Sequence, residues 1–153
     1  MTMFLHDFTY IDQPAGAVSE RLLADHGSWL SPLAVHAAAE GEEIRVRVGP
    51  GGRPVLGKIV TVEVGEPYRR GEVTVAPLSW HAASQVAAFP VLTADLEVAP
   101  LGPGRTQLTL RGRYDPPLGA VGEWLDGVLL HHIAEASVRS FLRQIAGALA
   151  AAA

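Results

Sequence analysis

The sequence predicts an α+β domain in which a curved antiparallel sheet lies against one long C-terminal helix. Between residues 43 and 114 the apolar residues recur with a period of two, and Gly- and Pro-containing turns separate the runs. Such tight connections favour antiparallel neighbours. After Asp115-Pro116-Pro117 a helical pattern continues almost to Ala153. A late helix of that length has to lie across the sheet to bury its apolar residues, and 153 residues fit a single domain, 1–153.

The N-terminal part is expected to form one strand and two short helices. Residues 4–11 are rich in aromatic and β-branched side chains and predict a strand. Asp12-Gln13-Pro14 is typical of a helix start, with Pro14 in the first turn, and Gly27 is expected to end that helix. A second short helical piece is predicted for residues 29–39, broken near Pro32.

Five further strands follow from the alternation of apolar and polar residues. The runs are residues 43–48, 59–64, 72–80, 92–98 and 106–114, separated by turns such as Gly49-Pro50-Gly51-Gly52 and Gly65-Glu66-Pro67. In the long helix the apolar stripe of the second half consists of Ala134, Val138, Phe141, Ile145 and Leu149. Glu135, Arg139 and Arg143 lie on another side at a spacing that suits i,i+4 pairing, and residues 147–153 are expected to fray.

Composition excludes several classes of protein. The formal charge of −4 argues against a general nucleic-acid binder. The chain has no Cys, which excludes disulfides and thiolate metal sites. No stretch predicts a signal peptide or a membrane span, so a cytoplasmic location is expected. We expect neither a metal nor another cofactor.

Three places could carry acid–base chemistry. His131 and His132 each lie one helical turn from Glu135, although adjacent histidines diverge on a helix and the H-E-x-x-H metal spacing is absent. His81 follows Trp80 at the end of an apolar strand, and Tyr114 could offer a hydroxyl to a ligand. His132, His81 and Tyr114 are therefore the candidate catalytic residues, with a structural role as the alternative for each. The paired arginines (45 and 47, 69 and 70, 111 and 113) are expected on the solvated face of the sheet.

The chain resembles a known superfamily. The residues that carry the resemblance are Phe89-Pro90-Val91-Leu92, then Tyr114-Asp115-Pro116-Pro117-Leu118-Gly119, then the long helix. This order is similar to that of the helix-grip proteins, which include START lipid-transfer domains, birch-pollen-allergen-like proteins and polyketide cyclases, and it looks most like the polyketide cyclase/dehydrase branch often found in bacteria. The resemblance implies a sheet wrapped around the C-terminal helix, with a mostly apolar pocket between them.

Strand alternation and helix phase then predict which side chains line that pocket. The expected ligand-binding residues are Val62, Val75, Trp80, Phe89, Leu96, Leu110, Tyr114, Leu125, Val128, Leu129 and His132. The first expectation is binding of a small apolar molecule, either a lipid or a polyketide-like compound. A cyclase, aromatase or dehydratase is the alternative, and a protein-binding module is a further one. The sequence suggests a monomer or homodimer and shows no obvious exposed apolar stripe for dimerisation.

Overall fold

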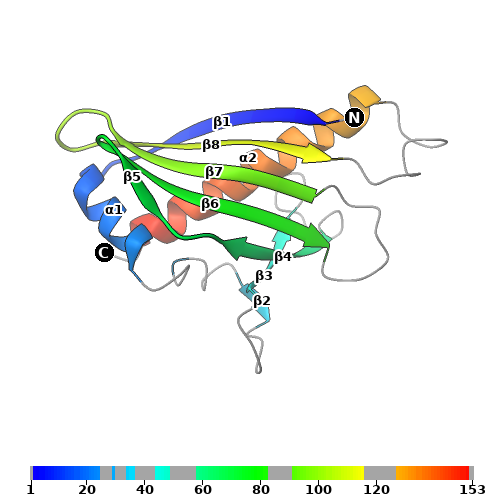
Figure 1. Cartoon of the computed structure of the whole chain (residues 1–153), viewed down its shortest axis with the longest axis horizontal. Coiled ribbons are helices and arrows are strands. Elements are labelled where there is room, and N and C mark those ends of the chain that lie inside the picture. The colour runs from blue at the N-terminus through cyan, green and yellow to red at the C-terminus, as the bar shows by residue number, and fades with distance from the viewer. Residues whose placement is uncertain are drawn as a thin grey trace.

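Two helices cover one face of a large antiparallel sheet. The computed structural model describes residues 2–24, 29, 34–36, 44–48, 58–82, 91–115 and 127–151. Helix α1 spans Ala15–Leu23, and helix α2 spans Gly127–Ala151. In Figure 1, α2 runs behind the sheet along its length, and α1 lies near the C-terminal end of α2. The predicted layering of a sheet against a long late helix is confirmed.

The sheet has eight strands, and every pairing in it is antiparallel. In chain order the strands are β1 Met3–Ile11, β2 Ala34–His36, β3 Ile44–Val48, β4 Lys58–Val64, β5 Tyr68–Arg70, β6 Val73–Ala82, β7 Val91–Pro100 and β8 Thr106–Asp115. Their spatial order is β1-β8-β7-β6-β4-β3-β2, and β5 pairs with β6 beside this path. The N-terminal strand β1 is therefore one edge of the sheet, next to the last strand.

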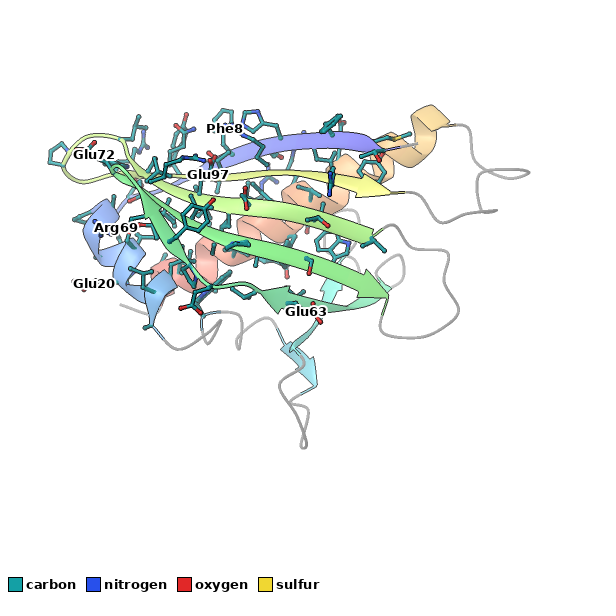
Figure 2. All side chains as sticks on the ribbon, in the orientation of Figure 1. Phe8, Glu20, Glu63, Arg69, Glu72 and Glu97 are labelled. Atoms are coloured by element: carbon teal, nitrogen blue, oxygen red, sulfur yellow. The ribbon has the colours of Figure 1, made fainter. Side chains whose placement is uncertain are left out.

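The strand register separates the sheet into two faces. One row across five strands consists of Met3, Tyr114, Leu92, Trp80 and Val62. These residues belong to the core or pack against it, so this row lies on the inner face, the one that the helices cover. The ring of Trp80 packs edge-on against Phe141 of α2, with the ring centroids 5.2 Å apart. Residues between the inner rows lie on the outer face, which points away from α2. The register places Thr93 there, and Glu63 is labelled in Figure 2.

The second short helix is wrong where it can be tested. Within the segment 29–39, Ala34–His36 form strand β2, which pairs with β3. The run of small residues favoured a helix, but pairing with a neighbouring strand overrides local propensity. Trp29 itself lies in a 3₁₀ turn and is buried, and the other residues of the segment are outside the described part of the chain.

Strand β5 was not predicted either. Arg69 and Arg70 were expected as solvated surface, and three residues are too few to reveal a period of two. The strand forms because a two-residue turn returns the chain onto β6, placing Arg70 opposite Val73. Gly71 adopts a φ of 63° in this turn, a conformation that glycine reaches without a steric penalty.

Helix α1 holds the C-terminal end of α2. Arg21 donates to the carbonyl oxygen of Leu149 at 2.5 Å and also to the side-chain oxygen of Gln13. Gln13 donates in turn to the carbonyl oxygen of Ala150 at 3.0 Å. These last carbonyls have no partner within the helix, so the side chains from α1 and its approach act as a cap.

The structure corrects the expected ends of both helices. Residues 147–151 remain helical, and Ala148 and Leu149 are buried, so the expected fraying is wrong for them. Helix α1 starts one residue later than expected, with Pro14 at its N-cap rather than in its first turn. It ends at Leu23, whereas Gly27, the expected end, lies outside the described residues.

Candidate functional site

Tyr114 places a phenol in the layer between the sheet and α2. It is the largest fully buried side chain, with 1% of its surface exposed. Strand β8 directs it inward, and Met3 lies opposite on β1. The hydroxyl donates a hydrogen bond to the sulfur of Met3. A thioether sulfur is a weak acceptor for a hydroxyl.

Burial and a nearby carboxylate keep this phenol protonated. Burial is the larger cause and raises the pKa of Tyr114 above its ordinary value of 10.0, and the negative charge of Glu135 on α2 raises the pKa further. Both effects disfavour the phenolate. At neutral pH Tyr114 can therefore donate a hydrogen bond or a proton, but it cannot act as a base.

A second buried donor lies in the same core. The indole nitrogen of Trp29 is buried and has no hydrogen-bond partner among the residues that the structure describes. Leaving a buried donor unsatisfied costs roughly 1–3 kcal/mol, and most buried donors in proteins have a partner. The core between sheet and helices thus contains a polar group that suits an incoming acceptor.

Apart from Val75, the predicted site residues fall into three groups. Five are buried on the inner face: Val62, Trp80, Leu96, Leu110 and Tyr114. Four belong to described strands or helices, but their side chains lie outside the described part: His81, Val128, Leu129 and His132. Phe89 and Leu125 lie wholly outside it.

Among the predicted site residues whose side chains the structure describes, Val75 is the one that lies on the outer face of the sheet. It is fully buried, but its neighbours in the register are Tyr68 on β5 and Glu97 on β7, which belong to the outer face. The alternation of Val73 and Val75 suggested the opposite phase for β6. The inner position is instead Thr74, which pairs with the core residue Val98 and whose hydroxyl donates to Ser19 of α1 at 3.1 Å. We therefore leave Val75 out of the proposed site.

Comparisons of the structure with solved structures give one consistent result. The aromatase/cyclase Zhui from Streptomyces sp. R1128 is similar over 97% of this chain and 94% of its own, with 15% identity and a TM-score of 0.59. A START superfamily protein from Mycobacterium smegmatis covers 97% and 95%, with 13% identity and a TM-score of 0.53. Norcoclaurine synthase from Thalictrum flavum covers 96% and 86%, with 12% identity and a TM-score of 0.56. This chain has the helix-grip fold.

Sequence comparisons add nothing to this assignment. No protein-family model matches the chain, and the search of curated proteins found no match. The likeness is therefore one of structure, and it supports the fold that the order of elements suggested.

Among the described residues of this helix-grip chain, no group of three or more His, Asp or Glu is placed to hold a metal ion. None of the helices described is long and apolar enough to cross a membrane.

The described residues form one groove outside the helix-grip core. A groove of about 610 Å³ lies among outer-face residues of β1, β4, β6, β7 and β8, and we call it the outer groove. Its floor includes Gly65, Pro77, Ala94 and Gly112. Charged residues and an aromatic ring stand around it: Glu63, Asp95, Arg111, Arg113 and Phe4. Sequence reasoning did not predict this groove, and none of the predicted pocket residues lines it.

Sequence reasoning also missed an exposed aromatic stripe. Phe4, Phe8 and Tyr10 lie on the outer face of β1, with 78%, 50% and 44% of their surfaces exposed. The expectation that the chain shows no exposed apolar stripe was therefore wrong. The signal was present in the alternation of these aromatics with the inward residues Leu5 and Ile11.

The expected solvated arginines are exposed, but two of them share a carboxylate. Arg69, Arg70, Arg111 and Arg113 are all exposed, as predicted. Arg70 lies 2.5 Å from one oxygen of Glu97, and Arg111 lies 3.6 Å from the other. Glu97 is largely buried and so links β5 to β8 across the outer face. The side chains of Arg45 and Arg47 lie outside the described part.

Proposed function

We propose that this protein binds a small, largely apolar molecule between the inner face of the sheet and α2. The wall on the sheet side consists of Val62, Trp80, Leu96 and Leu110, which are apolar and buried. Small-molecule sites in proteins combine such apolar walls with a few well-placed polar groups. The polar groups here are the Tyr114 hydroxyl and the Trp29 indole.

The buried indole N–H of Trp29 is the observation that carries this proposal. It lacks a hydrogen-bond partner within the described part of the chain, so a ligand with an acceptor would remove the cost of leaving it unsatisfied. Tyr114, held as a neutral phenol, adds a second donor. A mostly apolar molecule with carbonyl or hydroxyl oxygens fits this pair of donors better than a plain hydrocarbon. Polyketide-like compounds have this chemistry, which agrees with the likeness to an aromatase/cyclase.

A catalytic role is the second candidate, and Tyr114 is the reason for it. The raised pKa keeps the Tyr114 phenol protonated, so its hydroxyl is present as a hydrogen-bond or proton donor for a substrate oxygen. Cyclisation and dehydration both need such a donor when a carbonyl or hydroxyl oxygen gains charge. Tyr114 would then act as the acid, with His81 or His132 as the candidate base.

Native mass spectrometry tests the binding proposal. The protein purified from cells should carry a reproducible adduct, or should acquire one from a panel of fatty acids and aromatic polyketides. Leu129→Trp should abolish the adduct, because the indole would occupy the space between α2 and the sheet. Arg143→Trp adds the same bulk at an exposed position of α2 and should leave the adduct unchanged.

Circular dichroism of both variants guards against a trivial loss of fold. An adduct that persists in folded Leu129→Trp would contradict the placement of the site. The absence of any adduct with the whole panel would contradict apolar binding altogether. For the catalytic candidate, Tyr114→Phe should preserve the adduct and remove turnover of a polyketide substrate, whereas unchanged turnover would exclude Tyr114 as the acid.

A further inference from the structure

The charged residues around the outer groove are arranged by sign. Arg111 and Arg113 stand on β8, whereas Asp95 stands on β7 and Glu63 on β4. Within the described part of the chain, Glu63, Asp95 and Arg113 make no ion pair and no side-chain hydrogen bond. Arg111 has one partner, Glu97, at 3.6 Å. Asp95 lies directly opposite Arg111 in the register, whereas Glu63 on β4 and Arg113 on β8 lie at opposite ends of the groove. The groove therefore has an anion, Glu63, at one end and a cation, Arg113, at the other.

Close backbone packing at Gly65 leaves that part of the groove without a side chain. A Cβ atom on Gly65 would lie 3.0 Å from the Cβ of Pro77, so this position does not accept a side chain without movement of its neighbour. Gly112 belongs to the inner row with Leu5 and Leu78, and only its backbone contributes to the floor of the groove. The outer face of a sheet is otherwise covered by side chains that extend from every second residue.

A single register row sets the span between the two charged ends. Across the sheet, Glu63 lies beside Ser79, Ser79 beside Thr93, Thr93 beside Arg113, and Arg113 beside Phe4. Strands lie roughly 4.8 Å apart, so three steps separate Glu63 from Arg113 by about 14 Å. An extended peptide rises about 3.3 Å per residue, so roughly four residues cover the same span.

We propose that the outer groove binds a short extended peptide lying across the strands. Its basic end lies over Glu63, and its acidic end lies over Arg113, where a guanidinium group can hold a carboxylate through paired hydrogen bonds. The hydroxyls of Ser79 and Thr93 lie between the ends, within reach of peptide groups. An apolar side chain near the acidic end packs on the exposed ring of Phe4.

A nuclear magnetic resonance titration with defined peptides tests this proposal. The probe is the tetrapeptide Lys-Ala-Phe-Glu, and the readout is the backbone amide signals of Gly65, Ser79 and Gly112. We expect saturable shifts at these amides with a dissociation constant of about 1 mM or lower, as for a small ligand held by exposed charges. Arg113→Gln should weaken binding about fivefold, since a charge-assisted contact is lost at an exposed position.

Charge reversal provides the decisive comparison. Arg113→Glu should lose affinity for Lys-Ala-Phe-Glu and gain affinity for the amidated peptide Lys-Ala-Phe-Lys. Arg143→Glu changes the net charge equally at an exposed position of α2, away from the groove, and should alter neither affinity beyond a small uniform shift. Phe4→Ala should weaken Lys-Ala-Phe-Glu without affecting stability, because Phe4 is 78% exposed.

Three outcomes would overturn the proposal. The first is an absence of saturable shifts at millimolar concentrations of the probe. The second is an equal effect of Arg113→Glu and Arg143→Glu, which would indicate non-specific attraction. The third is a set of shifts that depends on protein concentration without peptide, which would make the groove a contact between two copies of this chain.

Discussion

Replacing Gly112 with alanine tests how tightly β7 and β8 approach each other. The added methyl would meet three atoms closer than carbon and oxygen atoms normally lie: the Thr93 carbonyl oxygen at 2.5 Å, the Ala94 Cβ at 2.5 Å and the Ala94 Cα at 2.8 Å. Two of these three atoms belong to the backbone of β7, so a rotamer change cannot relieve them. The strands have to move apart at the row that also contains Leu5 and Leu78.

The expected cost follows from this geometry. Overpacking a well-ordered interior by a methylene costs typically 1–3 kcal/mol, and we expect the upper end, about 3 kcal/mol, because backbone must shift. For a domain of this size that loss corresponds to a decrease in Tm of roughly 6–12 °C. Combining Gly112→Ala with Ala94→Gly removes only one of the three close contacts, so it should recover less than half of the loss.

Denaturant unfolding followed by circular dichroism measures the free energy of unfolding for each variant. Gly147→Ala is the matched control, since it adds the same methyl at an exposed position inside α2 with nothing within 4 Å. That change should stabilise the protein by about 0.5–1 kcal/mol, because alanine has less backbone freedom to lose in a helix. If Gly112→Ala were neutral or stabilising, the close approach of β7 to β8 at this row would be wrong.

Three further predictions concern the core and the contacts of the helices. Arg21→Ala should destabilise the protein by about 2 kcal/mol, since it removes two charge-assisted hydrogen bonds at the end of α2; hydrogen exchange should speed up at Leu149 and Ala150, and unchanged exchange there would contradict the cap. Phe141→Ala should cost about 3–5 kcal/mol, because the ring is fully buried against Trp80; a loss under 1 kcal/mol in a thermal melt would count against that packing. The pKa of Tyr114 is raised above 10.0 in the folded state, so the unfolded state loses this proton at a lower pH than the folded state does. The free energy of unfolding should therefore keep the full contribution of Tyr114 below pH 10.0 and should fall as the pH rises through the folded pKa. Tyr114→Phe should flatten this decline, and Glu135→Gln should lower the pKa seen in phenolate absorbance without restoring the ordinary value; an unchanged pKa in Glu135→Gln would show that the two groups are not coupled.

Strands and helices with many residues were predictable from the sequence, whereas short strands and features that depend on distant parts of the chain were not. The strands at 92–98 and 106–114 and the buried stripe of Val138, Phe141, Ile145 and Leu149 have enough residues to reveal their period, and all are found in the structure. Strand β2 and strand β5 have three residues each and depend on partners that are remote in the sequence, so local propensity misassigned the first and missed the second. Face assignment failed at Val75, because β-branched residues occur on both faces of β6 and only the contact of Thr74 with Ser19 decides the phase.

Features of the site depended even more on tertiary structure. Tyr114 was found among the candidates because it ends an alternating strand, but its coupling to Glu135 joins β8 to α2 and leaves no mark in either segment. The floor of the outer groove comes from Pro77, Ala94 and Gly112 on three strands and from Gly65 directly after β4, and the strand register brings them together. Trp29 was expected as a core or pocket-wall aromatic in a segment predicted as helix, and only the structure shows that its indole N–H is buried.

The hydrogen bonds from α1 to the end of α2 also constrain when this protein can finish folding during synthesis. They join residues 137 and 128 positions apart in the chain, from Gln13 to Ala150 and from Arg21 to Leu149. Strand β1 likewise cannot pair before β8 is synthesised, because β8 is its neighbour in the described sheet. Contacts of such long range form late, because a large loop must close before they contribute. The first 23 residues therefore leave the ribosome without their partners, and chains arrested before residue 149 should remain sensitive to protease in α1.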